Sequence, residues 1–250
     1  MQLSQLVGYL DDYLRVRDVP DASEALNGLQ VGGRAEVTRV AAAVDLCEAT
    51  VRLAAERGAD FLIVHHGLFW GGLRPLTGPQ LRRVAGLLKH DIALYGAHLP
   101  LDLHSDVGNN PVLARELGVT IKGEFGESRG VAIGVWGELA VSRAELEQRL
   151  ARTLGAPPKV LAFGPETTRR VGIVTGAAGG MIGQAAAAEL DTFITGEGLH
   201  HSYFDAEELG LNVLLGGHYA TETMGVKALA AHLQSRFGLP WVFLDHPTGL

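Results

Sequence analysis

The sequence has 250 residues, of which 47% are hydrophobic and 20% are charged, and its formal net charge is −7. This composition is typical of a globular protein with one large or two small domains, and the negative charge argues against a general nucleic-acid-binding protein, which normally carries a basic stripe. The single cysteine, Cys47, excludes intrachain disulfides and fits a reducing compartment. No apolar run reaches 18 residues, and Asp11 and Asp12 interrupt the N-terminal segment too early for a signal peptide, so we expect a cytoplasmic protein without membrane contact.

Strands and helices alternate along the first half of the chain. Leucine and valine at helical spacing predict an amphipathic helix over 3–14. A turn at 27–32 leads into a short strand, and the pattern then predicts buried strands at 39–45, 61–64 and 92–96, with helices at 48–57, 79–89 and 111–117. This alternation is typical of parallel βαβ units, so the predicted fold class is α/β.

The loop over 68–78 follows the strand 61–64 and contains glycine, proline, Phe69 and Trp70. It is too apolar for a plain solvent-exposed connection. It could act as a lid, or it could pack against a neighbouring subunit, and the sequence favours neither.

The polar, glycine-containing stretch 122–130 interrupts the alternation, and we predict a domain boundary there, with domains at 1–125 and 126–250. A strand at 131–136 follows, and Ser142 with Glu145 forms a capping box for a helix that runs to about 154. After a buried strand at 170–176, Gly179 and Gly180 turn the chain into another helix. That turn suits either anion binding through backbone N–H groups or tight packing.

The two halves of the chain resemble each other. The segment from Arg39 to Gly67 aligns with the segment from Arg170 to Gly198 at a constant offset of 131, and 95–102 aligns with 215–222 at an offset of 120. The difference corresponds roughly to the loop 68–78. We therefore predict two similar α/β domains that arose by internal duplication, with the functional site between them.

Two adjacent histidines, His65 and His66, end the strand 61–64 and are followed by Gly67. Imidazole is the commonest metal-ligating side chain, and open α/β sheets place their ligands at the carboxyl ends of strands. At a strand end the two rings could splay toward two neighbouring ions. The alternative is a pair of rim histidines bonded to backbone carbonyls.

His218 and Glu222 stand four residues apart at the start of a predicted helix. On one helical face they could share a metal ion, although Glu222 could instead cap the helix while His218 packs. The aligned pair in the first half is His98 and Asp102. We assign His98 a supporting role, with direct ligation as the alternative, and we expect His200 and His201 to lie on a surface helix.

The candidate ligands combine imidazole and carboxylate without a thiolate. Such a set suits Zn²⁺, Mn²⁺ or Fe²⁺ and contains too much nitrogen for Ca²⁺ or Mg²⁺. A bridging carboxylate can hold two ions about 3.5–4 Å apart, and one ion with spare histidines is the alternative. The predicted ligands are His65, His66, Asp102, His218 and Glu222.

Five motifs occur in an order and spacing that resemble one protein family, the dinuclear-metal proteins called GTP cyclohydrolase 1 type 2 homologs or Nif-three-like proteins. The motifs are VHHGLFW at 64–70, HLPLD at 98–102, VGNN at 107–110, TGE at 195–197 and GGHYATE at 216–222. The resemblance implies the same five ligands, two similar α/β domains and a homohexameric ring that encloses a cavity. Glu197 lies in the TGE motif.

Two hypotheses follow for the function. The first is a metal-dependent hydrolase that acts on a nucleotide, a purine ring or another phosphorylated small molecule, with two divalent ions per chain and Glu197 as the proton-transfer group. The second is a non-catalytic metal-binding scaffold whose ring presents surfaces to partners.

Overall fold

The computed structural model describes residues 1–250, and the chain divides into two compact units. Unit 1 comprises Met1–Val107 and Gly225–His246, whereas unit 2 comprises Gly108–Met224 and Pro247–Leu250. These units differ from the predicted spans 1–125 and 126–250. Residues 122–128 of the predicted boundary are part of a strand, and 129–130 form the turn after it. The chain returns to unit 1 near its C-terminus.

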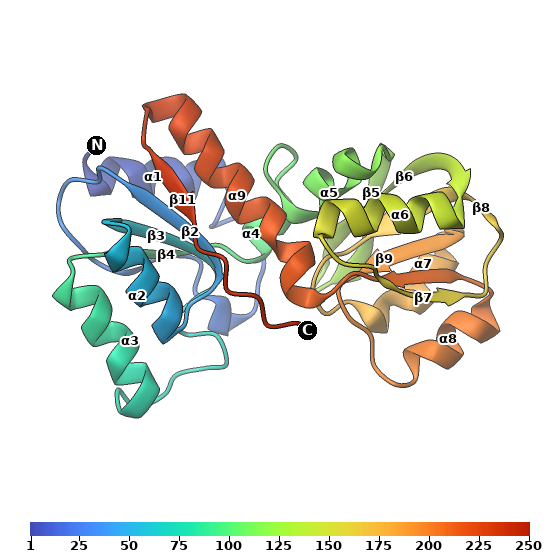
Figure 1. Ribbon diagram of the computed structural model, residues 1–250, viewed down its shortest axis with the longest axis horizontal. Helices are drawn as coiled ribbons and strands as arrows, with labels where there is room; N and C mark the ends of the chain where they lie inside the picture. Colours follow the sequence, from blue (N-terminus) through green and yellow to red (C-terminus); the bar gives the residue numbers. More distant parts are fainter. The chain divides into compact units, whose positions relative to one another are not determined.

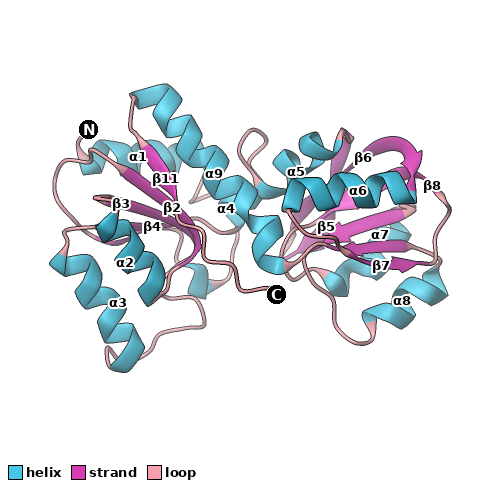
Figure 2. Ribbon diagram, viewed as in Figure 1, coloured by secondary structure: helices cyan, strands magenta, loops and turns pink.

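Unit 1 is a five-stranded sheet with the strand order β1-β4-β3-β2-β11, and it is covered by helices (Figures 1 and 2). Strands β4, β3, β2 and β11 pair in parallel in that order, and β1 joins β4 antiparallel. The elements are α1 (Leu3–Tyr13), η1 (Ser23–Ala25), β1 (Gly28–Val31), β2 (Val40–Asp45), α2 (Glu48–Glu56), β3 (Phe61–His66), α3 (Gly78–Lys89), β4 (Ala93–Gly96), α4 (Leu99–Asp102), β11 (Trp241–Phe243) and the part of α9 (His218–Phe237) from Gly225 onward.

Alternate residues of these strands face two separate cores. Val40, Ala42, Phe61 and Ile63 pack with α1 and α9, whereas their sequence neighbours on β2 and β3 pack with α2 and α3. Both faces of the sheet are therefore buried, as expected for parallel strands that read as continuous apolar runs. The unit has three layers, with helices on both sides of the sheet.

Unit 2 repeats this arrangement around a six-stranded sheet with the order β5-β6-β8-β9-β10-β7. Helices α5 and α6 cover one face, and α7 and α8 cover the other. The elements are α5 (Asn109–Leu117), β5 (Thr120–Ser128), β6 (Val131–Ser142), α6 (Arg143–Leu154), β7 (Lys159–Ala162), β8 (Thr167–Ile173), η2 (Gly179–Met181), α7 (Ile182–Ala187), β9 (Thr192–Thr195), α8 (Ser202–Leu209) and β10 (Asn212–Leu215). The stretch predicted as a boundary forms β5, whose polar residues suit an exposed edge strand paired only with β6.

Equivalent hydrogen bonds support the predicted repeat. The buried Asp60 carboxylate accepts the backbone N–H groups of Thr38 and Arg39. At an offset of 131, the Asp191 carboxylate accepts those of Arg169 and Arg170. The same pair of backbone hydrogen bonds therefore lies just before β2 in unit 1 and within β8 in unit 2.

The later part of the repeat follows a different register from the predicted one. Phe61 pairs with Ala93, and Thr192 pairs with Asn212, which sets the offset of the last strand at 119 rather than 120. His98 therefore corresponds in place to Gly217, and the predicted match of His98 with His218 is wrong by one residue. The sequence alone favoured aligning His98 with His218 because the residues are identical.

No helix in the structure has both the length and the hydropathy that a membrane crossing requires.

A stack of rings in unit 1 carries a pH-sensitive contact. His232 on α9 stacks on Tyr13 with ring centroids 4.3 Å apart and contacts the hydroxyl of Tyr9. Burial lowers the pKa of His232, and Arg236 lowers it further against the opposing effect of Asp106. The folded protein therefore favours the neutral form of this imidazole.

We expect His232 to make the metal-free protein less stable as the pH falls below about 6.5, the ordinary pKa of histidine. A depressed folded-state pKa stabilises the fold fully above the unfolded pKa, and that contribution disappears as the pH falls toward the folded value. Urea unfolding of His232→Gln between pH 8 and 5 should show a shallower loss of unfolding free energy than the wild type. His90→Gln, at the exposed end of α3, is the control, and equal slopes in all three proteins would contradict the prediction.

Candidate metal centre

The two histidines at the end of β3 are held by acceptors on their Nδ1 atoms. His65 Nδ1 lies 2.8 Å from the carbonyl oxygen of Ala97, and His66 Nδ1 lies 2.8 Å from Asp45 Oδ1. Both partners can only accept, so each Nδ1 donates and the lone pair resides on Nε2. Both side chains are buried, and their Nε2 atoms are the ring nitrogens available to a metal ion.

His98 completes a cluster of three imidazoles in unit 1. Its Nδ1 lies 2.9 Å and 3.1 Å from the two carboxylate oxygens of Asp21, so it too carries its lone pair on Nε2. The candidate ligand atoms of His65, His66 and His98 all lie within 4.8 Å of one another, close enough to hold a metal ion. The structure thus places His98 with the candidate ligands, whereas the sequence favoured a supporting role.

Asp102 lies in the short helix α4, which sequence patterns did not predict. Its Oδ2 lies 3.5 Å from His65 Nε2, and only 7% of the residue is exposed. The separation is longer than a good hydrogen bond and suits two ligands around a shared cation. The structure therefore brings together the three predicted ligands of the first half.

Two residues of the loop after α1 support this cluster and were missed by sequence analysis. Burial alone would raise the pKa of Asp21, but hydrogen bonds from His98, Asn27 and the Ala22 backbone together lower it. Asn27 also accepts the backbone N–H of His98 at 2.7 Å. Asp21 stays ionised and orients His98. No local spacing in the sequence predicts this contact.

Gln30 connects the cluster to the segments around it. Its amide nitrogen donates to the carbonyl oxygens of Ala25 and Leu26 at 2.9 Å each, and its amide oxygen accepts the Leu68 N–H at 2.7 Å. A Cβ atom at Gly67 or Gly96 would overlap the Gln30 side chain. Glycine after the histidine pair is therefore required for this close packing.

His218 in unit 2 lies between two carboxylates. Its Nε2 is 3.1 Å from Glu222 Oε2, and its Nδ1 is 2.8 Å from Glu197 Oε1. The hydrogen bond to Glu222 and, less strongly, the one to Glu197 raise the pKa of His218 to about 9 against the effect of burial. Without a metal, a protonated imidazole neutralises this acidic site, and an incoming cation would replace that proton.

The predicted roles of the second-half residues fit this geometry to different degrees. His218 and Glu222 share one face at the start of α9, as their spacing predicted. Glu197, predicted as the proton-transfer group, occupies the position of a carboxylate that orients a ligating imidazole through its second nitrogen. In this position it can hold a proton at His218 Nδ1.

The glycine-rich turn after β8 packs tightly and shows no sign of an anion site. The backbone N–H groups of Gly176, Ala178 and Gly179 already donate to Thr221, Thr195 and Glu197. Gly176 has a φ of +69°, and a Cβ atom there would overlap Glu222 Oε1. Of the two alternatives for this turn, the structure favours close packing.

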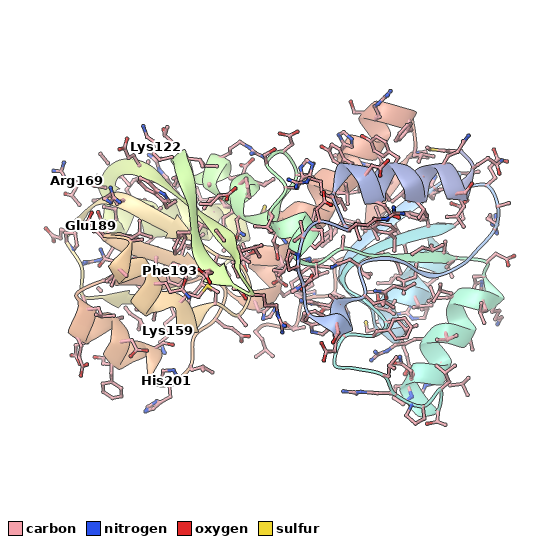
Figure 3. All side chains as sticks on the ribbon, turned by 180° about the vertical axis from the view of Figure 1, so that it is seen from behind. Lys122, Lys159, Arg169, Glu189, Phe193 and His201 are labelled. Carbon is pink, nitrogen blue, oxygen red and sulfur yellow. The ribbon has the colours of Figure 1, made fainter.

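His200 and His201 lie at the surface, as expected, in the turn before α8 rather than within the helix. Figure 3 shows the His201 side chain projecting outward from unit 2, whereas Phe193 lies inside it.

Trp70 covers part of the histidine cluster. Its ring centroid lies 4.8 Å from that of His66 and 4.4 Å from that of His98, and 41% of the residue remains exposed. The aromatic loop after β3 thus places an accessible indole ring beside the candidate ligands. This position does not distinguish the two alternatives for the loop, a lid or packing against a neighbouring subunit.

Comparisons with known proteins agree on one family. The family model described as Duf34/NIF3 (NGG1p interacting factor 3) matches residues 1–248. A Deinococcus radiodurans protein named GTP cyclohydrolase 1 type 2 homolog is 45% identical over 98% of this chain and 94% of its own length. A protein of that name from Archaeoglobus fulgidus is 44% identical over the whole of both chains. The crystal structure of TTHA1606 from Thermus thermophilus is similar over the whole of both chains, with a TM-score of 0.91 and 48% identity.

Proposed function

This chain belongs to the Duf34/NIF3 family, and on that premise we propose that it is a metal-dependent hydrolase that uses two divalent ions per chain. In this proposal His65, His66 and Asp102 of unit 1 and His218 and Glu222 of unit 2 are the ligands, and His98 is an additional donor. The donor set favours Zn²⁺, Fe²⁺ or Mn²⁺.

The observation that carries the proposal is the hydrogen bond on the Nδ1 atom of every histidine involved. Carboxylates of Asp45, Asp21 and Glu197 and one backbone carbonyl oxygen accept these bonds. Such partners fix the tautomer and raise the basicity of a ligating imidazole. A structural histidine pair at a sheet rim would not need four separately supported rings.

When bound, two divalent ions would supply a water deprotonated near neutral pH and would polarise the bond to be broken. The protein's own residues would position that chemistry. Glu197 would hold a proton at His218 Nδ1, and the buried carboxylates would offset the positive charge of the ions. We propose a substrate with a heteroaromatic ring, such as a nucleotide or a purine, because Trp70 offers a ring for stacking beside the cluster.

A non-catalytic scaffold is the second candidate function, and the family description as an interacting factor favours it. The two candidates differ in what the ions must do. A scaffold could bind its partners even if protein ligands filled every coordination position of the ions. A hydrolase needs one coordination position that is open to water or substrate.

The proposal is tested by metal content and turnover measured on the same samples. Protein reconstituted with Zn²⁺, Mn²⁺ or Fe²⁺ should retain about two ions per chain, the number of a two-metal centre. A screen of nucleotides and other hydrolysable phosphorylated metabolites should reveal turnover that a chelator removes and added metal restores. His65→Ala and Glu222→Ala should lose metal, whereas His200→Ala with His201→Ala should not. Protein that retains no metal, or a metal-free sample with full turnover, would refute the hydrolase.

Glu197→Gln should weaken metal binding by about 10- to 100-fold, the effect of losing a carboxylate that supports a ligating histidine. The amide keeps the size of Glu197 but provides less charge to polarise the His218 ring. Competition with a chelator measures the affinity, and turnover at saturating metal measures any separate loss. A variant with unchanged metal affinity and slow turnover would assign Glu197 to proton transfer alone.

A further inference from the structure

A buried asparagine side chain bridges strands β6 and β8 at the point where their pairing ends. Asn110, in the first turn of α5, is only 1% exposed. Its amide nitrogen donates to the Ile133 carbonyl oxygen on β6 at 2.7 Å, and its amide oxygen accepts the Thr175 N–H at 2.7 Å. Asn110 ends the VGNN motif at 107–110, which contains none of the predicted ligands.

The amide takes the place of the next backbone pair between the two strands. The last pair of this antiparallel ladder joins Val135 with Ile173, so two residues further along each strand Ile133 would face Thr175. The Asn110 amide instead bonds to both of these residues, and β8 ends at Ile173. A buried backbone N–H needs an acceptor, and the side chain provides one after the ladder has stopped. The chain can therefore leave the sheet at Thr175 without an unpaired buried N–H group.

The residue after Thr175 supports the second half of the metal centre. Gly176 packs directly against two candidate ligands, because a Cβ atom added to it would overlap Glu222 Oε1 and would lie 3.4 Å from His218 Nε2. The Gly176 N–H donates at 3.1 Å to Oγ1 of Thr221, which lies between those ligands on the first turn of α9. Asn110 and all of these residues belong to unit 2.

We propose that Asn110 is a positioning residue for metal binding, which sets the turn of Thr175 and Gly176 against the ligands of unit 2. Asn110 acts through this turn, because it holds Thr175 and the adjoining Gly176 limits where the Glu222 carboxylate can lie. Without the amide, the Thr175 N–H would lose its acceptor and the turn would be free to move away from Glu222. The inference rests on the metal centre of the proposed function, but it concerns metal affinity and geometry rather than hydrolysis.

Asn110→Ala should lower the affinity for Zn²⁺ by about tenfold, the lower end of the range for residues that support ligands. Competition with a chelator measures this affinity, and the visible absorption of Co²⁺-loaded protein reports the coordination geometry. We expect the Co²⁺ bands of the variant to shift, because the Glu222 carboxylate and the His218 ring lose the packing that fixes them. A residue that only stabilises the fold would leave the Co²⁺ spectrum unchanged.

Asn212→Ala is the matched control within the same unit. The Asn212 side chain is also buried, accepts the Gly164 N–H at 3.1 Å and donates to the Pro165 carbonyl oxygen at 2.8 Å. It lies at the start of β10, whereas His218 follows the other end of that strand. Both variants should unfold at a lower temperature than the wild type, because each leaves buried backbone groups unpaired. Only Asn110→Ala should change the metal affinity and the Co²⁺ spectrum.

A second pair of variants tests the same turn if Asn110→Ala does not fold. Thr221→Val keeps the shape of the side chain but removes the hydroxyl that accepts the Gly176 N–H, whereas Thr221→Ser keeps that hydroxyl. We expect Thr221→Val to weaken Zn²⁺ binding by about tenfold and Thr221→Ser to retain the wild-type affinity. Equal affinities in these two variants would show that the turn does not position the ligands.

The outcomes separate this inference from the proposed function. Wild-type affinity and an unchanged Co²⁺ spectrum in Asn110→Ala would overturn the positioning role and leave the metal centre intact. Equal losses of affinity in Asn110→Ala and Asn212→Ala would also overturn it, because they would reflect general destabilisation. Wild-type protein that binds neither ion would refute the metal centre itself. Metal binding that depends on Asn110 in a protein without turnover would support the positioning role and refute the hydrolase alone.

Discussion

Gly176→Ala is expected to abolish metal binding at the second half of the centre, although it adds only one methyl group. The new Cβ atom would overlap Glu222 Oε1 and would lie 3.4 Å from His218 Nε2. Glu222 is only 4% exposed and cannot swing into solvent to relieve the overlap. The φ of +69° adds backbone strain of about 1–2 kcal/mol for a residue with a Cβ atom.

The measurement is metal affinity by chelator competition, together with thermal unfolding. We expect the affinity to fall by more than about 100-fold, beyond the 10- to 100-fold range for residues that only support ligands. Gly180→Ala is the control, because a Cβ atom there meets nothing within 4 Å and the residue lies nearby in η2. Normal metal binding in Gly176→Ala would show that Glu222 is not a ligand.

Asp102→Asn should be nearly as damaging, despite keeping an oxygen at the same place. The side chain is buried beside His65, and its negative charge is the part of the site that can hold two cations close together. We expect about one ion per chain instead of two. We expect turnover to fall by about 10²–10³-fold, the scale of losing one preorganised electrostatic group.

Asp106→Asn removes the same charge four residues away on the exposed turn after α4 and serves as the control. Elemental analysis and turnover measured on both variants test whether Asp102 is a metal ligand. Two ions retained in Asp102→Asn with full turnover would remove Asp102 from the centre.

The alternation of strands and helices was predictable from the sequence because it depends on local patterns. The family resemblance is confirmed by the match over residues 1–248. His65 and His66 follow an apolar strand, and that strand forms as predicted, only extending through both histidines to His66. The spacing of His218 and Glu222 likewise predicted their contact.

What sequence reasoning missed depends on contacts between distant segments. Asp45 and Asp21 bond His66 and His98 across separations of 21 and 77 residues, and no spacing rule connects them. Strand β11 consists of three residues, too few for a periodic signal. The edge strand β5 resembled a linker in the sequence because it is polar and contains glycine, as an exposed strand paired only with β6 can be. The cytoplasmic location and the hexameric ring stay predictions.

The division of the chain also bears on the order in which it can fold as it leaves the ribosome. Domains usually fold from the N-terminus onward during synthesis. Here the core around Leu6 and Leu10 includes Val226, Leu229 and Leu233 of α9, and β2 pairs with β11. The N-terminal residues of unit 1 therefore cannot complete their core until the segment from Gly225 onward has been synthesised. The segment from Gly108 to Met224 can form its own core earlier. A nascent chain stalled near residue 224 should expose the apolar N-terminal helix to chaperones, and release of the segment 225–250 should bury it.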